Sequence, residues 1–193
     1  MERVMSQARV LNPTELRRVL DYVATRRHSA RNRCALLLTH LAGMRCAEVS
    51  SLRINNVLNN DGTIKDEIRL MPSQTKGKHA RTVYINERMQ KEIAQYIKCL
   101  KIKDVTKPLF YTQKREQFSA NTLCQYFFFL YRNAGLEGAS SHSGRRGYLT
   151  TMANAGISIH LLKELAGHRN ISTTGKYLFA SPTQLKQAIT LLN

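Results

Sequence analysis

The chain has 193 residues, a length that fits one domain with short appendages, and 42% of its residues are hydrophobic, enough to form a core. Lysine and arginine number 30 against 13 aspartate and glutamate, which gives a formal net charge of +17. Such an excess is typical of proteins that bind a polyanion, most often nucleic acid. A membrane surface is the alternative, but it favours a polybasic tail or basic amphipathic helix, whereas here the charge is spread along the chain.

Signals for export or membrane insertion are missing from this sequence. The opening segment MERVMSQARV has no apolar core, and no run approaches the roughly 18 apolar residues of a membrane span. The cysteines form no CxxC pair: Cys34, Cys46, Cys99 and Cys124. We therefore expect reduced thiols, no metal and no cofactor, in a cytoplasmic protein that binds DNA or RNA.

The first part of the chain predicts helices. Asn12 before Pro13 is typical of a helix start, because Asn caps the helix and Pro fits its first turn. The apolar residues that follow fall on one helical face: Leu16, Val19, Leu20 and Val23. The stretch 35–42 is apolar nearly all round, which predicts a buried central helix. Gly43 interrupts this helix, and a short helix is expected over 45–52.

The pattern changes between Ile54 and Ile85. Asn59-Asn60-Asp61-Gly62 is typical of a turn. Residues 67–71 and 81–85 carry β-type residues with partial alternation, and they flank the basic turn 76–79. We expect a small antiparallel sheet with an exposed basic hairpin.

Helical periodicity returns in the second half. A helix is expected from Asn86, with one apolar face formed by Met89, Ile93, Tyr96, Ile97 and Leu100. Further helices are expected over 121–134, 142–155 and 159–166. Ser158 predicts the cap of the last one, and Gly167 predicts its end. The whole predicts an α+β fold, mainly α-helical with a small antiparallel β-sheet, in a single domain over residues 1–193.

Two of four short segments that suit phosphate chemistry lie in the first half. Arg45 follows a glycine break, where it can point toward an anion near a helix start. Taken alone, this segment favours the alternative, a surface salt bridge with Glu48, three residues on. The turn over 75–81, with glycine at its tip and cations beside it, suits a finger laid along a DNA groove or an ordinary solvated turn.

The other two segments lie near the end of the chain. His142 and Arg145 are three residues apart on the expected helix, so that one phosphate could meet both side chains. The alternative is a histidine at a helix start beside an exposed arginine. Tyr177 follows the pair Gly167-His168 by nine residues. Most tyrosines are core or interface residues, so this tyrosine alone says little.

Together, the order and spacing of these segments resemble the catalytic domain of the tyrosine recombinases, the phage integrase family. That domain carries an Arg in a short motif ending in an acidic residue, a Lys on a β-hairpin, a His-x-x-Arg box, a Gly-His pair and a Tyr after a Ser-Thr-Thr-like run. Every element occurs here in order, from about Leu11 to Leu178. The resemblance implies the fold of that domain and six catalytic residues: Arg45, Lys76, His142, Arg145, His168 and Tyr177.

The resemblance also implies the role of each residue. Tyr177 attacks phosphorus, two arginines clamp the charged oxygens, Lys76 protonates the departing 5′ oxygen, and His168 hydrogen-bonds the phosphate. His142 accepts the tyrosine proton or donates to the phosphate, and Glu48 orients its neighbours. Two assignments have rivals: Lys78 competes with Lys76, and Arg146 with Arg145. The Lys-Gly hairpin tip and the His-x-x-Arg spacing select the first of each pair. Further DNA contacts are expected from Lys78, Arg81, Arg146 and Arg169.

The family implies duplex DNA as the partner, a tetrameric synapse and an accessory DNA-bending protein. The reaction would be integration, excision, inversion or resolution within a bacterial or phage-infected cell. Most members carry an additional helical domain before the catalytic one. Only about ten residues precede the first helix here, as in a short recombinase such as the fimbrial switch invertases, or in an excised domain. The tail, about 180–193, is expected to contact a neighbouring protomer or its own domain through Leu185, Ile189 and Leu192.

Other functions remain as alternatives. A type IB topoisomerase shares the chemistry but relaxes supercoils, and the small size and the two histidine boxes favour a recombinase. A non-catalytic DNA-binding regulator on the same fold would have no need of nucleophile, acid and clamps together. The hypothesis of an RNA-binding protein is supported by the net positive charge alone. The recombinase hypothesis requires six side chains to meet around one backbone phosphate.

Overall fold

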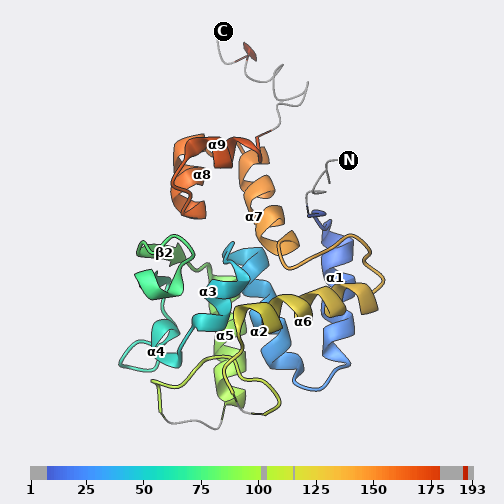
Figure 1. Ribbon diagram of the computed structural model, residues 1–193, viewed down its shortest axis with the longest axis vertical. Coiled ribbons are helices and arrows are strands. Elements are labelled where there is room, and N and C mark those ends of the chain that lie inside the picture. The colour runs from blue at the N-terminus through green and yellow to red at the C-terminus, as the bar shows by residue number, and fades with distance from the viewer. Residues whose placement is uncertain (1–7, 101–103, 115, 179–188, 191–193) are drawn as a thin grey trace. The chain divides into compact units, whose positions relative to one another are not determined.

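Helices form most of the secondary structure in the computed structural model, which describes residues 8–100, 104–114, 116–178 and 189–190 (Figure 1). In chain order the elements are α1 (Pro13–Ala24), α2 (Ser29–Leu41), α3 (Cys46–Ser51), α4 (Ile54–Val57), β1 (Glu67–Leu70), the 3-10 helix η1 (Pro72–Gln74), β2 (Arg81–Tyr84), α5 (Glu87–Cys99), α6 (Ala120–Asn133), α7 (Ser143–Asn154), α8 (Ile159–Ala166) and α9 (Ile171–Gly175). They fall into two compact units, Met1–Tyr148 and Leu149–Asn193. The expected mainly helical fold with a small sheet is confirmed.

The first unit is built around α2. This helix packs against α1, α3 and α5, while α6 packs against α1 and α3 (Figure 1). The predicted apolar stretch of α2 is buried on nearly every side, because it is surrounded by these neighbours. The predicted face of α1 also forms: Val19, Leu20 and Val23 are buried, and Leu16 packs at the edge of the core.

The sequence signals for helix starts are confirmed in detail. Asn12 Oδ1 accepts a hydrogen bond from the Glu15 amide at 2.9 Å, and the Glu15 carboxylate accepts from the Asn12 amide at 3.0 Å. This reciprocal cap satisfies two backbone donors that the first helical turn leaves unpaired. Asn86 caps α5 through a single bond, in which its Oδ1 accepts from the Met89 amide at 2.9 Å.

The sheet consists of β1 and β2, paired antiparallel as expected. Ile68 faces Val83 across the pair, and both side chains are buried against the core. On the opposite face Glu67, Arg69 and Tyr84 are exposed and Thr82 is half-buried. The alternation therefore gives the hairpin one face on the protein and one face toward solvent.

A close approach between α7 and α2 requires glycine at Gly144. A Cβ atom there would lie 2.9 Å from the Cβ of Thr39 and 2.8 Å from Cδ2 of His40, both closer than real Cβ contacts. This explains the glycine within the His142-Ser143-Gly144-Arg145 box in packing terms. His142 itself precedes α7, whose first residue is Ser143, so the expected helix starts one residue later.

The second unit holds the rest of α7, together with α8 and α9. Ser158 caps α8 by accepting from the Leu161 amide, and Gly167 ends it in the left-handed conformation at φ 59°, as the sequence predicts. Helices α8 and α9 pack against each other. Helix α9 was not expected, and neither was α4 in the first unit. Both are too short to show a hydrophobic period.

Among the described residues, no helix is long and apolar enough to cross a membrane. The expected tail falls mostly outside them: Leu185 and Leu192 are not described, and Ile189 is exposed.

We predict that Gly144→Ala will destabilise the protein by about 1–3 kcal/mol, because the added methyl overpacks the contact with α2. Gly147, one turn further along α7, is the matched control, since its added Cβ would meet only Val10 Cγ1 at 3.7 Å. Gly147→Ala should be neutral or stabilising by up to about 1 kcal/mol. Urea unfolding of the two variants checks this, and equal midpoints would contradict the packing argument.

Candidate active site

A buried carboxylate on α3 joins two arginines. Glu48 is 0% exposed. Its Oε2 accepts from the Arg45 backbone amide at 2.8 Å, and its Oε1 accepts from Arg45 Nη1 at 2.9 Å. On its other side, Arg81 donates from Nε at 3.1 Å and from Nη2 at 2.8 Å, a two-pronged contact with both oxygens. The ion pair of Arg45 with Glu48 is present, but Glu48 is buried, so it is not the surface salt bridge considered from the sequence, and Arg81 adds to it.

The contact by Arg81 follows from strand alternation. Arg81 pairs with Leu70 and lies two residues before Val83, whose side chain is buried. Residues two apart point to the same face of a strand, so Arg81 points toward the protein, and its side chain is only 9% exposed. We expected this arginine at the DNA. The pattern Arg81-x-Val83-x-Ile85 already contained the signal for its inward direction.

The charge state of Glu48 depends on its two partners. Burial is the largest influence and raises the pKa of this carboxyl group, but it is outweighed by the charge and hydrogen bonds of Arg81 and by the amide and charge of Arg45. The net effect lowers the pKa of Glu48 below its ordinary value. Glu48 is therefore ionised at neutral pH, and it holds both guanidiniums in place.

Arg145 is fixed to the same segment of chain. Its side chain is buried, and Nη1 donates to the carbonyl oxygen of Gly43 at 2.6 Å. Gly43 has φ 60°, and a Cβ there would lie 2.7 Å from Cε1 of Tyr148 and closer still to Cδ1 of the same ring. Glycine is thus required by backbone and by space. Both candidate clamp arginines are consequently positioned by residues 43–48.

Lys76 lies in a turn whose two ends are attached to α3. The Lys78 amide donates to the Thr75 carbonyl at 3.2 Å, which makes Lys76 and Gly77 the central residues of the turn. Before the turn, Gln74 Nε2 donates to the carbonyl of Ser51 at 3.1 Å, and after it Arg81 binds Glu48. The lysine is exposed. The backbone of Lys76 is therefore held near α3, while its exposed side chain is free to extend toward a ligand.

The left-handed residue of this turn is Lys78, with φ 52°, rather than the glycine. Lys76 and Lys78 are both exposed, so exposure does not choose between them as the catalytic lysine.

His142 is exposed and lies where α7 begins. Its amide donates to Ser140 Oγ at 3.3 Å, and the neighbouring residue Ser141 accepts a hydrogen bond from the thiol of Cys46 at 3.6 Å through its carbonyl oxygen. Cys46 is the first residue of α3. The segment bearing His142 is therefore attached to the same short helix as Arg45 and Lys76.

The second unit brings His168 and Tyr177 together. Their rings stack with centroids 6.0 Å apart and 18° between planes. Nδ1 of His168 lies 3.0 Å from the hydroxyl of Thr174, which is buried in α9. This contact helps to fix the orientation of the imidazole. The second unit thus places the histidine of the Gly-His pair beside the tyrosine.

The remaining candidates are cationic and partly or fully exposed. Lys78 and Arg169 are exposed, and Arg146 is half-buried. Across the described part of the chain, no three His, Cys, Asp or Glu side chains are grouped so as to hold a metal ion.

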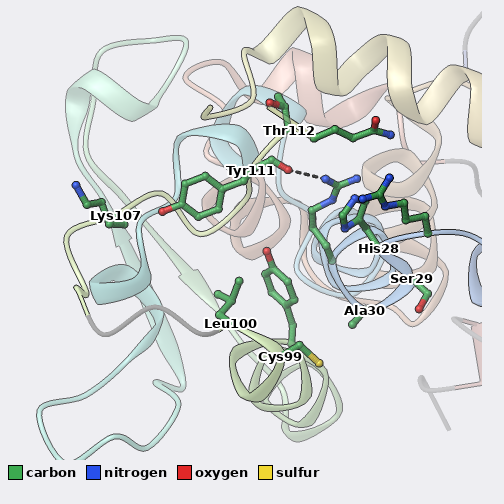
Figure 2. Close-up of a pocket in the computed structure, with 12 residues that line it drawn as sticks. His28, Ser29, Ala30, Cys99, Leu100, Lys107, Tyr111 and Thr112 are labelled. Carbon is green, nitrogen blue, oxygen red and sulfur yellow. Dashed lines mark hydrogen bonds between the residues drawn. The ribbon is translucent and has the colours of Figure 1, made fainter. Parts of the chain in front are cut away.

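A cavity of about 890 Å³ lies elsewhere in the first unit (Figure 2). It is lined by the end of α5, the start of α2 and the loop around Tyr111, and the carbonyl of Tyr111 accepts from Arg31 at 2.6 Å. None of the candidate catalytic residues lines it. The candidate residues of the first unit instead occupy the hairpin, α3 and the start of α7.

One residue near the arginines was not singled out from the sequence. The phenol of Tyr148 is half-buried, and burial raises its pKa, while the charges of Arg81 and Arg145 act in the opposite direction. The net rise makes its phenolate scarce at neutral pH. Its contact with Gly43 indicates a packing role, and no sequence signal distinguished it from the other tyrosines.

The chain belongs to the phage integrase family, whose profile matches residues 9–183. The catalytic-domain fold inferred from the four short segments is confirmed.

The curated relatives are named tyrosine recombinases. The chain is 27% identical over 186 residues to "Tyrosine recombinase XerA" of Pyrococcus furiosus, covering 95% of this chain and 61% of that protein. It is 30% identical over 153 residues to "Tyrosine recombinase XerC" of Caldanaerobacter subterraneus, covering 76% and 40%. The chain therefore spans only part of the length of these relatives.

Solved structures share the fold. A crystal structure of XerA recombinase matches with a TM-score of 0.74 at 20% identity, over 95% of this chain and 65% of that one. The Tn1549 transposon integrase, in complex with circular intermediate DNA, matches with a TM-score of 0.77 at 18% identity, over 100% and 70%.

We predict that Glu48→Gln will destabilise the protein by roughly 3–5 kcal/mol at neutral pH, because it leaves the arginines without a buried counter-charge. A carboxylate whose pKa is lower in the folded than in the unfolded state stabilises the folded protein when the pH is above the unfolded-state pKa. This contribution is lost as the pH falls through the folded-state pKa. The difference in unfolding free energy between wild type and variant should therefore become smaller as the pH falls below about 4.5, the ordinary pKa of a glutamate carboxyl group. Urea unfolding across pH measures it.

The control for this prediction is Glu164→Gln, since Glu164 is exposed and its ion pair with Lys163 lies at the surface. It should change stability by less than about 0.5 kcal/mol. If Glu48→Gln differed from wild type by the same unfolding free energy at all pH values, the ionised state of Glu48 would not be the cause of the destabilisation.

Proposed function

We propose that this protein is a site-specific tyrosine recombinase that cleaves and rejoins duplex DNA through a 3′-phosphotyrosyl link at Tyr177. The observation that carries the proposal is the anchoring of Arg45, Lys76, His142 and Arg145 to one short helix and the segment before it. The stacking of His168 on Tyr177 supports the same function. The names of the relatives agree with it.

The arginines suit the charge that develops in the reaction. When the Tyr177 oxygen attacks phosphorus, negative charge builds on the non-bridging phosphate oxygens. A guanidinium stays protonated, and its planar fork matches two such oxygens. Arg45 and Arg145 are already held by Glu48 and by the Gly43 carbonyl, so little reorganisation is needed as charge develops. Arg81 would act through Glu48, as a positioning residue.

Protons must move in both directions during cleavage. The tyrosine hydroxyl loses its proton as the oxygen–phosphorus bond forms, and His142 accepts it or donates to the phosphate. The 5′ oxygen gains a proton as its bond to phosphorus breaks, and Lys76 supplies it. His168 donates a hydrogen bond to a phosphate oxygen. Rejoining is the reverse sequence, so the ester conserves the bond energy.

Duplex DNA is the proposed partner, contacted by Lys78, Arg146 and Arg169, with four protomers on two DNA sites. The net charge of +17 supports a polyanionic partner. Sedimentation of complexes with paired target sites tests the assembly, and monomers alone on such DNA would contradict it.

We predict that wild-type protein will form a covalent adduct with a nicked suicide substrate and that Tyr177→Phe will form none, since only the hydroxyl is removed. Tyr148→Phe is the matched control, because this phenol lies near the arginines and its ring packs on Gly43. Its adduct yield should stay within about twofold of wild type. Denaturing electrophoresis of labelled DNA gives the yield. A covalent adduct formed by Tyr177→Phe would reject Tyr177 as the nucleophile. Loss of the adduct in Tyr148→Phe but not in Tyr177→Phe would reject it too.

We also predict that Lys76→Ala will slow cleavage by about 10²–10⁴-fold, the contribution of general acid catalysis. A substrate with sulfur in place of the 5′ bridging oxygen should restore the rate, because a thiolate leaves without protonation. Lys78→Ala should reduce binding without such rescue, and Arg45→Ala should stay slow on both substrates. Rescue of Lys78→Ala instead would assign the acid to Lys78. Single-turnover cleavage rates provide the measurement.

A further inference from the structure

The cavity of about 890 Å³ in the first unit has a positively charged wall (Figure 2). Arg27, His28 and Arg31 line it on one side, and no aspartate or glutamate is among its lining residues in the described chain. Lys107 lies on the opposite side, and its Nζ is 3.7 Å from a carboxylate oxygen of Asp104. The side formed by the two arginines and the histidine therefore carries positive charge that the cavity itself does not balance.

Arg31 is buried without a carboxylate beside it. The residue is 8% exposed, and its Nη1 donates to the carbonyl oxygen of Tyr111 at 2.6 Å. Nε and Nη2 donate to the side-chain oxygen of Asn32 at 3.0 and 2.8 Å. These acceptors are neutral, and Arg31 forms no ion pair with any residue that the structure describes. A buried charge is normally paired, so an anion in the cavity would supply the partner that the described chain does not.

The first turn of α2 adds backbone donors to the same wall. His28 holds the N-cap position with φ 61°, and its side chain makes no capping hydrogen bond. In the described part of the chain, no acceptor pairs with the amides of Ser29, Ala30 and Arg31, and all three residues line the cavity. The free amides and the dipole of a helix start attract an anion. Here they act together with cationic side chains rather than alone.

The cations of this wall are close enough to repel one another. The pKa of His28 is lowered, first by burial and then by the positive charges of Arg31 and Arg27. A bound anion would replace this repulsion by attraction to all three side chains. The charge of the wall therefore favours a negatively charged occupant.

The rest of the cavity suits a flat apolar group. Ala30, Tyr96, Cys99, Leu100 and Tyr111 contribute apolar surface or rings to its lining. A volume of about 890 Å³ is that of a small-molecule site and far exceeds what one phosphate group fills. The occupant that fits joins an anionic group, for the charged wall, to a ring that contacts the remaining walls.

We propose that this cavity binds a small organic anion, in which a phosphate or carboxylate group is attached to a flat ring and lies against Arg27, Arg31 and the start of α2. Helix α2 leads from this cavity to the segment 43–48, and its 13 residues span about 20 Å at 1.5 Å per residue. The site is thus separate from the candidate active site, and it does not depend on the proposed function.

Protection of a native thiol tests the site directly. Cys99 lines the cavity and is exposed, whereas Cys124 is half-buried and lies outside the lining, which makes it the internal reference. The reduced protein is alkylated with N-ethylmaleimide and digested with a glutamate-specific protease. This digestion separates Cys99, in residues 93–116, from Cys124, in residues 117–137. The probes are adenosine monophosphate and indole-3-carboxylate, and the controls are adenosine, which lacks the anion, and inorganic phosphate, which lacks the ring.

We expect adenosine monophosphate, indole-3-carboxylate or both to slow alkylation of Cys99 and to leave Cys124 unchanged. The probe that protects at the lower concentration identifies the anionic group as phosphate or carboxylate. Adenosine and inorganic phosphate should each need a concentration at least about tenfold higher, because each lacks one half of the interactions. Absence of protection by both probes would overturn the proposal. Inorganic phosphate that protects as well as adenosine monophosphate would overturn the requirement for a ring.

A charge reversal in the wall provides a second test. Arg27→Glu should raise the probe concentration needed for protection by about tenfold or more, since it replaces an attraction by a repulsion. Arg17→Glu is the matched control, because Arg17 is exposed on α1 and lies outside the lining. It makes the same change in net charge and should behave like wild type. Equal weakening in both variants would reduce the effect to overall charge and overturn the site. Protection of Cys99 by duplex DNA instead of the probes would assign the wall to a DNA contact and overturn it too.

Discussion

The contact between Glu48 and its two arginines is the interaction on which the first unit's candidate site depends. A carboxylate without solvent access is stable as an ion only where opposite charges and hydrogen bonds replace water. Arg45 comes from the residue before α3 and Arg81 from the start of β2, so one ion joins a helix to a hairpin. The cluster of Arg45, Arg81 and Arg145 with Glu48 carries three positive charges and one negative, which leaves a net +2 to attract phosphate.

Helix α3 is short, and yet it organises far more chain than its length suggests. Its six residues and the segment before them receive contacts from the hairpin, from the loop before α7 and from α7 itself. A six-residue helix is not stable in isolation. Its conformation therefore depends on α2 and α6, which pack against it, and any change at α3 is transmitted to several candidate residues at once. This arrangement gives rigidity to the arginines while the Lys76 side chain stays exposed.

Local signals in the sequence were sufficient for most of the fold. Asn12, Ser158 and Gly167 are caps whose chemistry acts within a few residues, so their effects are legible without tertiary structure. The alternation of Arg81 with Val83 also predicted that Arg81 points toward the protein. We instead expected it at the DNA because it follows a basic turn. The left-handed conformation of Lys78 depends on tertiary contacts. Helices α4 and α9 are too short for a hydrophobic period to be visible in the sequence.

The candidate site shows where sequence reasoning needs help from a family pattern. No spacing rule joins Arg145 to the carbonyl of Gly43, because that contact depends on how α7 packs onto α2. The two tyrosines illustrate the same limit. Tyr148 lies near two arginines, which alone would favour it as a nucleophile, but burial raises its pKa and its ring packs on Gly43. Tyr177 instead stacks on His168, which Thr174 holds. The proposed nucleophile is therefore Tyr177, whose ring lies beside a fixed imidazole, whereas the ring of Tyr148 packs against the backbone of Gly43.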